Sequence, residues 1–139
     1  MTISVPSPAQ RLKSSGLRPT RQRLALAALL FRGEDRHVTA EQLFAEAQVA
    51  QIRVSLATIY NTLHQFTDAG LLREVVMEPG RSYFDTNVSE HHHFFFEDTG
   101  KLCDIPGGSV SLATCPSPPD GMSIRRVEVI IRLHSTSQS

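Results

Sequence analysis

The sequence lacks four features that would each assign it to a particular class of protein. Its 139 residues contain no apolar run long enough to cross a membrane, and the N-terminus has neither the basic start nor the apolar stretch of a secretory signal. The two cysteines, Cys103 and Cys115, are not in a Cys-x-x-Cys arrangement, which favours reduced thiols over a disulfide or a redox motif. There is no net charge, since 14 basic residues balance 14 acidic ones. We therefore expect a cytoplasmic protein with no membrane partner, too short to be a large enzyme.

The balanced total hides an uneven distribution of charge along the chain. Residues 1–36 contain seven arginine or lysine residues and only two acidic ones, whereas residues 37–90 contain three basic and seven acidic residues. A basic segment of this kind is the footprint expected of contact with nucleic acid phosphates. Any such contact is therefore expected near the N-terminus.

Capping signals predict four helices between residues 7 and 70. Ser7 and Thr39 each stand three residues before a glutamine, which is the spacing of a capping box, and Ser55 can cap the fourth helix. The second helix is expected from about Thr20 to Arg32, with one buried face formed by Leu24, Ala28 and Phe31. In the fourth helix the apolar residues recur at helical spacing: Leu56, Ile59, Leu63 and Phe66.

Beyond Gly70 the hydrophobic period changes from that of a helix to that of strands. Residues 71–77 and 82–86 are expected to form a hairpin around Glu78-Pro79-Gly80-Arg81. Helices followed by a short hairpin are typical of winged helix-turn-helix domains, in which the last helix enters the major groove and the wing lies along the DNA backbone. Small folds of this type also mediate protein contacts, so the pattern by itself leaves that alternative open.

A DNA-binding role would divide the candidate residues into two groups. The helix that starts after Ser55 would read bases, because side chains such as Asn61 can pair with the edge of adenine; its candidate residues are Ser55, Ala57, Thr58, Tyr60 and Asn61. Basic residues would neutralise phosphates and so position the protein without specifying sequence; these are Arg11, Lys13, Arg18, Arg21, Arg23 and Arg81.

Three consecutive histidines, His91, His92 and His93, follow the hairpin. In an extended segment side chains alternate, so His91 and His93 would point the same way with Cα atoms about 6.5 to 7 Å apart, and His92 would point to the opposite face. Two imidazoles at that spacing can bind one metal ion, although the triplet alone does not decide which metal. The alternative is a solvated strand edge without a ligand.

The C-terminal part is expected to form a separate small α/β unit. Strands are predicted for residues 91–96, 102–105 and 123–133, with a short helix over residues 109–114. So small a sheet would expose apolar surface, which a second copy of the chain would cover. The prediction is therefore an α+β fold, with a winged-helix DNA-binding domain over residues 1–86 and an α/β dimerisation and metal-sensing domain over residues 87–139.

Several motifs give the sequence a clear resemblance to the ferric uptake regulator superfamily. The motifs occur in the family's order and at its spacing: Arg18-Pro19-Thr20-x-x-Arg23, Thr39-Ala40-Glu41, Ser55-Leu56-Ala57-Thr58-Ile59-Tyr60-Asn61, Asp68-Ala69-Gly70 and His91-His92-His93. Ser82-Tyr83-Phe84-Asp85-Thr86-Asn87 before the histidines is similar to the iron response regulator branch of that superfamily.

The resemblance implies a metal-sensing site formed by His37, Asp85, His91, His93 and Asp104. Three imidazoles with one or two carboxylates suit Fe(II) or Mn(II), and zinc is an alternative. Two departures from the family pattern matter. Phe96 and Thr99 occupy positions where family members with a Cys₄ structural zinc carry cysteines, so we expect no such zinc. Asn61 stands where ferric uptake regulators often carry arginine, which implies a different operator preference.

In the iron response branch the resemblance also implies regulation by haem. The candidate haem ligands are His91, His92, His93 and Cys115, the last because Cys115-Pro116 resembles a haem regulatory motif. The alternative for Cys115 is structural, since chain segments commonly end before proline.

Together these features predict a homodimeric transcription regulator, a repressor of iron and haem homeostasis genes that binds a palindromic operator in double-stranded DNA. No catalytic residues are expected. A peroxide sensor using Fe(II) or Mn(II) at the same site is the alternative within this class. Two alternatives from other classes are a small non-haem iron enzyme, because two histidines and a carboxylate can form a facial triad, and a haem or metal carrier without DNA function.

Overall fold

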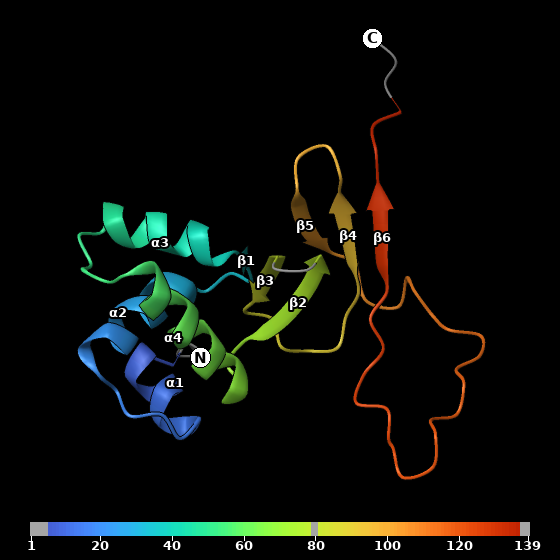
Figure 1. Ribbon diagram of the computed structural model, residues 1–139, viewed down its shortest axis with the longest axis horizontal. Coiled ribbons are helices and arrows are strands. Elements are labelled where there is room, and N and C mark those ends of the chain that lie inside the picture. Colours follow the sequence, from blue (N-terminus) through green and yellow to red (C-terminus); the bar gives the residue numbers. More distant parts are fainter. Residues whose placement is uncertain (1–5, 79–80, 137–139) are drawn as a thin grey trace, which may run out of the picture. The chain divides into compact units, whose positions relative to one another are not determined.

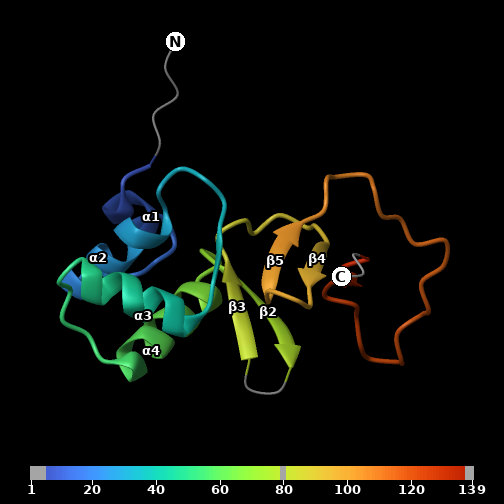
Figure 2. The ribbon, with the colours of Figure 1, turned by 90° about the horizontal axis from the view of Figure 1, so that it is seen from above.

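The computed structural model describes residues 6–78 and 81–136, and they form two compact units. The first unit comprises residues up to Val88 and the second begins at Ser89. The described residues contain four helices and two three-stranded sheets, and Figures 1 and 2 show the ribbon from two directions. Within the described residues, no helix is long and apolar enough to span a membrane.

The first unit consists of four helices and a three-stranded sheet (Figure 1). The helices are α1 (Pro8–Ser14), α2 (Arg21–Leu30), α3 (Ala40–Val49) and α4 (Leu56–Asp68). The sheet has the order β1-β3-β2, formed by β1 (His37–Val38), β2 (Arg73–Glu78) and β3 (Arg81–Asp85), all antiparallel. This is the predicted winged helix, although the central turn residues 79–80 of the hairpin lie outside the described residues.

Local capping chemistry fixes where the helices begin. The Ser7 and Thr39 side chains each accept a hydrogen bond from the backbone N–H three residues ahead. The side-chain oxygen of the glutamine there accepts one in turn from the backbone N–H of the cap residue. The Ser55 side chain likewise accepts a hydrogen bond from the backbone N–H of Thr58 at the start of α4. These three predicted caps are confirmed. Gly70 follows α4 with φ of +83°, a conformation that L side chains rarely adopt, so the predicted stop is confirmed as well.

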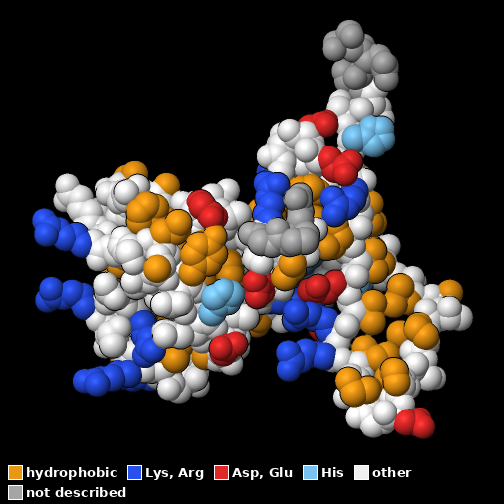
Figure 3. Space-filling model, in the orientation of Figure 1, with side chains coloured by type: hydrophobic (Ala, Val, Ile, Leu, Met, Phe, Trp, Pro, Cys, Tyr) orange, Lys and Arg blue, Asp and Glu red, His pale blue; other side chains and the backbone are white. Residues whose placement is uncertain are grey.

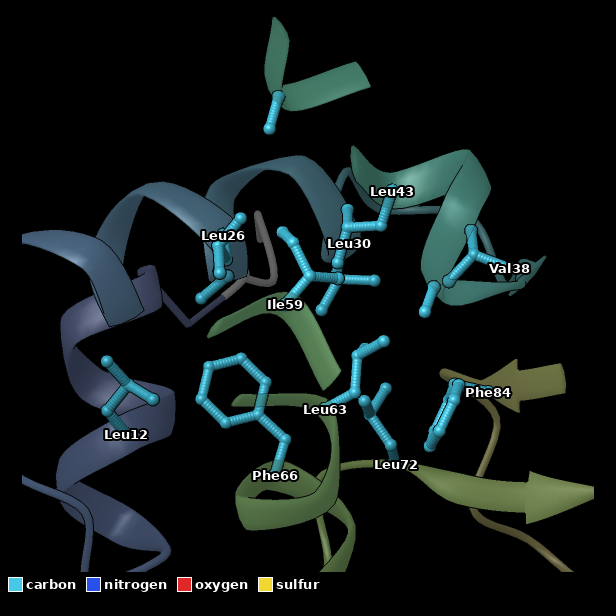
Figure 4. Close-up of a cluster of buried hydrophobic side chains, with 13 residues drawn as sticks. Leu12, Leu26, Leu30, Val38, Leu43, Ile59, Leu63, Phe66, Leu72 and Phe84 are labelled. Carbon is cyan, nitrogen blue, oxygen red and sulfur yellow. The ribbon is translucent and has the colours of Figure 1, made fainter. Parts of the chain in front are cut away.

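The helices pack around one hydrophobic core, shown in Figure 4. Ile59, Leu63 and Phe66 project from α4 into it, as predicted. The predicted face of α2 is wrong in part, because Ala28 is exposed and the buried residues are Leu26, Ala27 and Leu30. The second half of this helix is apolar on all sides, so its hydrophobic period does not single out one face.

The second unit is a three-stranded sheet of order β5-β4-β6. Its strands are β4 (His93–Phe96), β5 (Lys101–Asp104) and β6 (Ile130–Leu133), with β4 antiparallel to β5 and parallel to β6. A long segment without helix or strand connects β5 to β6 (Figure 1).

Two expectations for this connecting segment are wrong. The short helix predicted over residues 109–114 does not form, and the last strand starts at Ile130 rather than near Ser123. Gly107 and Gly108 precede the expected helix and Pro116 follows it closely, and a helix of so few residues is marginal unless tertiary packing supports it. Most residues from 109 to 114 are exposed, so that packing is missing.

Candidate metal and DNA-binding sites

The five metal ligands predicted from the sequence fall into two groups, one in each unit. The first group is His37 and Asp85, which are register partners on the antiparallel strands β1 and β3. The His37 Nε2 and Asp85 Oδ2 atoms are 3.0 Å apart, and the Asn87 backbone N–H donates to Asp85 Oδ1 at 2.8 Å. Asp85 is fully buried. A buried carboxylate is costly unless it is partnered, so the sheet must keep a cationic or hydrogen-bonding group beside it.

The second group is His91, His93 and Asp104. His93 on β4 and Asp104 on β5 are register partners, and His91 lies two residues before His93. The Asp104 Oδ1 atom is 3.0 Å from His91 Nε2 and 3.4 Å from His93 Nε2. In each of the three side chains a potential ligand atom lies within 4.8 Å of those of the other two. The structure thus brings together the two imidazoles that the alternation of side chains places on one face and the carboxylate that the family resemblance implied.

The surroundings of His91 favour a cation at this position. Its Nδ1 is 2.6 Å from the Ser89 carbonyl oxygen, while its Nε2 faces the Asp104 carboxylate. A neutral imidazole carries only one N–H, so it cannot donate to both oxygens. When Nδ1–H donates to the carbonyl, Nε2 presents a lone pair, and this is the usual arrangement of a metal-bound histidine whose other ring nitrogen donates to a backbone carbonyl. The donor set therefore fits a divalent cation.

His92 makes a different contact from its two neighbours. Its Nδ1 accepts a hydrogen bond from the Val129 backbone N–H at 3.0 Å, just before β6. A neutral ring that accepts at Nδ1 carries its proton on Nε2, and so offers no second lone pair to a metal. His92 therefore connects two segments of the second unit, and it takes no part in the group around Asp104.

The predicted reading helix α4 presents part of its polar side to solvent. Ala57 and Asn61 are exposed, whereas Thr58 and Tyr60 are half-buried. The Ser55 hydroxyl is occupied locally, since it accepts from the Thr58 N–H at 3.1 Å as the helix cap.

Tyr60 has a partner that the sequence did not reveal. Its hydroxyl donates to Glu41 Oε1 of α3 at 2.6 Å. This hydrogen bond raises the pKa of Tyr60 above its ordinary value and lowers the pKa of Glu41. Because the hydroxyl proton is directed to Glu41, the Tyr60 oxygen is left to act mainly as an acceptor.

The predicted phosphate-binding residues differ in the contacts they make within the protein. Lys13, Arg18 and Arg21 are exposed, and Figure 3 shows Lys and Arg side chains on the surface of the helical unit. Arg81 is exposed as well, and its guanidinium lies 5.9 Å from the centroid of the Tyr83 ring. Arg23 is engaged within the unit, since its guanidinium donates to the Arg18 carbonyl oxygen at 3.0 Å and to Gln65 Oε1 at 3.1 Å. Arg11 lies over the Phe31 ring, 4.7 Å from its centroid. These two arginines therefore also hold the helices together.

The four residues predicted as haem ligands, His91, His92, His93 and Cys115, all belong to the second unit. A cavity of about 460 Å³ is lined by His91 and His92, by Arg125 and Arg126, and by apolar residues that include Ile105 and Val127. Cys115 is exposed and does not line this cavity, and His93 is buried outside it.

Comparison with known proteins gives consistent matches along most of the chain. A sequence profile of the ferric uptake regulator family matches residues 14–113. The ferric uptake regulation protein of Klebsiella pneumoniae is 34% identical over 102 residues, covering 73% of this chain and 66% of that protein. The corresponding protein of Escherichia coli K12 is 34% identical over 100 residues, covering 71% of this chain and 68% of that protein. The matched region thus spans about two thirds of the length of these relatives.

Solved structures agree in fold. The ferric uptake regulator of Vibrio cholerae matches with a TM-score of 0.70 at 23% identity, covering 91% of this chain and 98% of that chain. The ferric uptake regulator of Pseudomonas aeruginosa with manganese matches with a TM-score of 0.68 at 22% identity, covering 94% of this chain and 98% of that chain. The predicted α+β architecture, a winged helix followed by a small second domain, is therefore confirmed.

Proposed function

Because the chain belongs to the ferric uptake regulator family, we propose that it is a metal-responsive repressor that binds a palindromic operator as a homodimer. The observation that carries the proposal is the division of the five ligands between the two units. His37 and Asp85 belong to the unit with the reading helix, whereas His91, His93 and Asp104 belong to the other. Members of this family regulate transcription and are not enzymes, so the enzyme alternative is set aside.

The two groups of ligands would serve one metal ion. Together they offer three imidazoles and two carboxylates, a set suited to Fe(II) or Mn(II), with zinc as a competitor. His37, Asp85, His91, His93 and Asp104 would hold the ion, which when bound would supply positive charge beside the two carboxylates. If one ion took ligands from both groups, His37 and Asp85 would restrain the unit that contains the reading helix. Only some orientations allow two reading helices to meet two half-sites, so DNA affinity depends on metal.

The proposed dimer rests on exposed apolar side chains in the second unit. Leu112, Met122, Ile124, Val127 and Ile131 are each at least 37% exposed, and hydrophobic side chains gather on this unit in Figure 3. A second copy related by two-fold symmetry would cover such surface and would present two reading helices to a palindrome. Sedimentation equilibrium is expected to give twice the chain mass of 15.4 kDa, and a monomer at micromolar concentration would contradict this.

The experiment that tests the shared site is a titration of Mn(II) into wild type, Asp85→Asn and Asp104→Asn, followed by calorimetry. A single site that uses both units predicts one ion per chain in wild type, and each variant should lose that same binding event. Two independent sites would instead leave one intact event in each variant. Asp120→Asn is the matched control, because Asp120 is an exposed carboxylate outside both groups, and it should bind as wild type does.

A role for haem is a second candidate, favoured by the cavity that His91 and His92 share with Arg125 and Arg126. Apolar walls with two guanidinium groups suit an amphipathic dicarboxylate such as haem. His91 would be the ligand, since His92 is engaged with Val129. Loss of the Soret shift in His91→Ala, with retention in Cys115→Ala, is the expected result; the opposite result would assign haem to the cysteine. The genes that we propose as its targets are those of iron and haem homeostasis.

A further inference from the structure

Arg36, which lies between α2 and β1, connects two helices through one guanidinium group. Its Nη1 donates to the Leu29 carbonyl oxygen at 2.9 Å and to Glu46 Oε1 at 3.0 Å, and its Nη2 donates to Glu46 Oε2. Leu29 belongs to the last turn of α2, whose carbonyls lack partners within the helix, and Glu46 belongs to α3. The planar fork of arginine makes this two-sided contact with fixed geometry.

The backbone of Arg36 is attached to the end of β3. Its N–H donates to the Thr86 hydroxyl at 2.9 Å, and the Thr86 N–H donates to the Arg36 carbonyl at 3.0 Å. The residues next to this pair are His37 and Asp85, the two metal-ligand candidates of the first unit. Any shift of β1 against β3 at those ligands therefore acts directly on Arg36.

Helix α3 continues the connection to the reading helix. Glu46, near its C-terminal end, pairs with Arg36, while Glu41, in its first turn, accepts the hydrogen bond from Tyr60 of α4. Helix α3 spans ten residues and packs against the core, so a displacement at one of its ends would be transmitted to the other. Through Glu46, the C-terminal end of α3 contacts Arg36, which is next to the predicted metal ligand His37. Through Glu41, its N-terminal end contacts Tyr60 of the reading helix.

We propose that Arg36 is a positioning residue that couples the His37–Asp85 pair to α3, and through α3 to the reading helix. The inference rests on the proposed function. It states in addition that the change in DNA affinity caused by metal depends on the contact between Arg36 and Glu46. In wild type such a change is expected to be about 5- to 150-fold.

The chain offers a matched control in Arg32. Its Nη2 lies 3.6 Å from the same Glu46 Oε1, but its side chain is 56% exposed. Arg32→Ala removes a positive charge next to Glu46 without removing the contacts to Leu29 and Thr86. If Glu46 acted only through its charge, Arg32→Ala and Arg36→Ala would reduce the metal-induced change in DNA affinity to a similar extent. If the coupling depends on Arg36, only Arg36→Ala should reduce it.

The test measures DNA affinity by fluorescence anisotropy, with and without Mn(II), on a duplex selected by wild type from random sequences. We expect Arg36→Ala and Glu46→Ala each to bring the ratio of DNA affinities with and without metal close to one, and the double variant to lose no more than either single one. Arg36→Lys should restore part of the change, and Arg32→Ala should match wild type. Circular dichroism and thermal unfolding of the metal-free variants check that the fold is kept.

Two results would overturn the inference: an unchanged metal effect in Arg36→Ala, or an equal loss in Arg32→Ala. If the alanine variants do not fold, Glu46→Gln decides, because it keeps the shape of Glu46 and removes its charge. A wild-type metal effect that persists in full in Glu46→Gln contradicts the proposal. A wild-type protein that shows no metal effect at all would instead refute the proposed function, so the two failures are distinguishable.

Discussion

Replacing His93 or His92 with alanine should produce opposite signatures, although the residues are adjacent. His93 Nε2 lies 3.4 Å from Asp104 Oδ1, whereas His92 accepts from the Val129 N–H. Loss of a group that hydrogen-bonds to a metal ligand typically costs about 10- to 100-fold in metal affinity. Loss of a ligand should cost at least the upper value, so we expect His93→Ala to weaken Mn(II) binding by about 100-fold or more, or about 2.8 kcal/mol.

His92→Ala should instead leave metal affinity unchanged and reduce stability. The variant leaves the half-buried Val129 N–H without its acceptor, and a lost partner of this kind costs about 1 to 3 kcal/mol, with the lower end expected at a partly buried position. Calorimetric titration gives the metal affinity, and urea unfolding of the metal-free protein gives the stability. Asp104→Asn, at a side chain that is 30% exposed, should reproduce the metal loss without a folding defect. If His92→Ala loses metal as completely as His93→Ala, the assignment of the two ring positions is wrong.

Asn61→Ala should cost about 1 to 3 kcal/mol in DNA binding and relax specificity at one base pair, because it removes a base-edge contact; competition with mutated duplexes measures this. Arg81→Ala should weaken binding to all sequences alike and reduce the slope of affinity against salt, and an unchanged slope would remove Arg81 from the phosphate contacts. Glu41→Gln should lower the raised pKa of Tyr60 towards 10.0, since the acceptor carboxylate is the main cause of the shift; an NMR titration that finds no difference from wild type would mean that the hydrogen bond is not formed in solution.

Local chemistry explains which parts of the fold could be predicted from sequence. The caps at Ser7, Thr39 and Ser55 depend on contacts three residues apart, and all three form as predicted. The buried face of α2 could not be predicted in the same way, because apolar residues surround its second half and tertiary packing selects Leu26 and Leu30. The helix expected over residues 109–114 failed for the related reason that no core covers it.

In the candidate sites, too, contacts set by local sequence could be predicted and contacts between different elements could not. The two-residue period of an extended chain predicts that His91 and His93 share one face, and both lie near Asp104, a residue that only the family resemblance implied. The contacts of Arg36 with Glu46 and of Tyr60 with Glu41 join different elements. No spacing rule within a single helix or strand signals such pairs, so only the folded structure reveals them.

The most direct test of the proposed function is a selection of duplexes from a random-sequence pool, carried out with and without Mn(II). A metal-responsive dimer should enrich a two-fold symmetric sequence in one of the two conditions, and its affinity for that sequence should differ between them by about 5- to 150-fold. The difference should disappear in Asp104→Asn. Failure to enrich any sequence in either condition, or equal affinity with and without metal, would contradict the proposal that metal controls DNA binding by this protein.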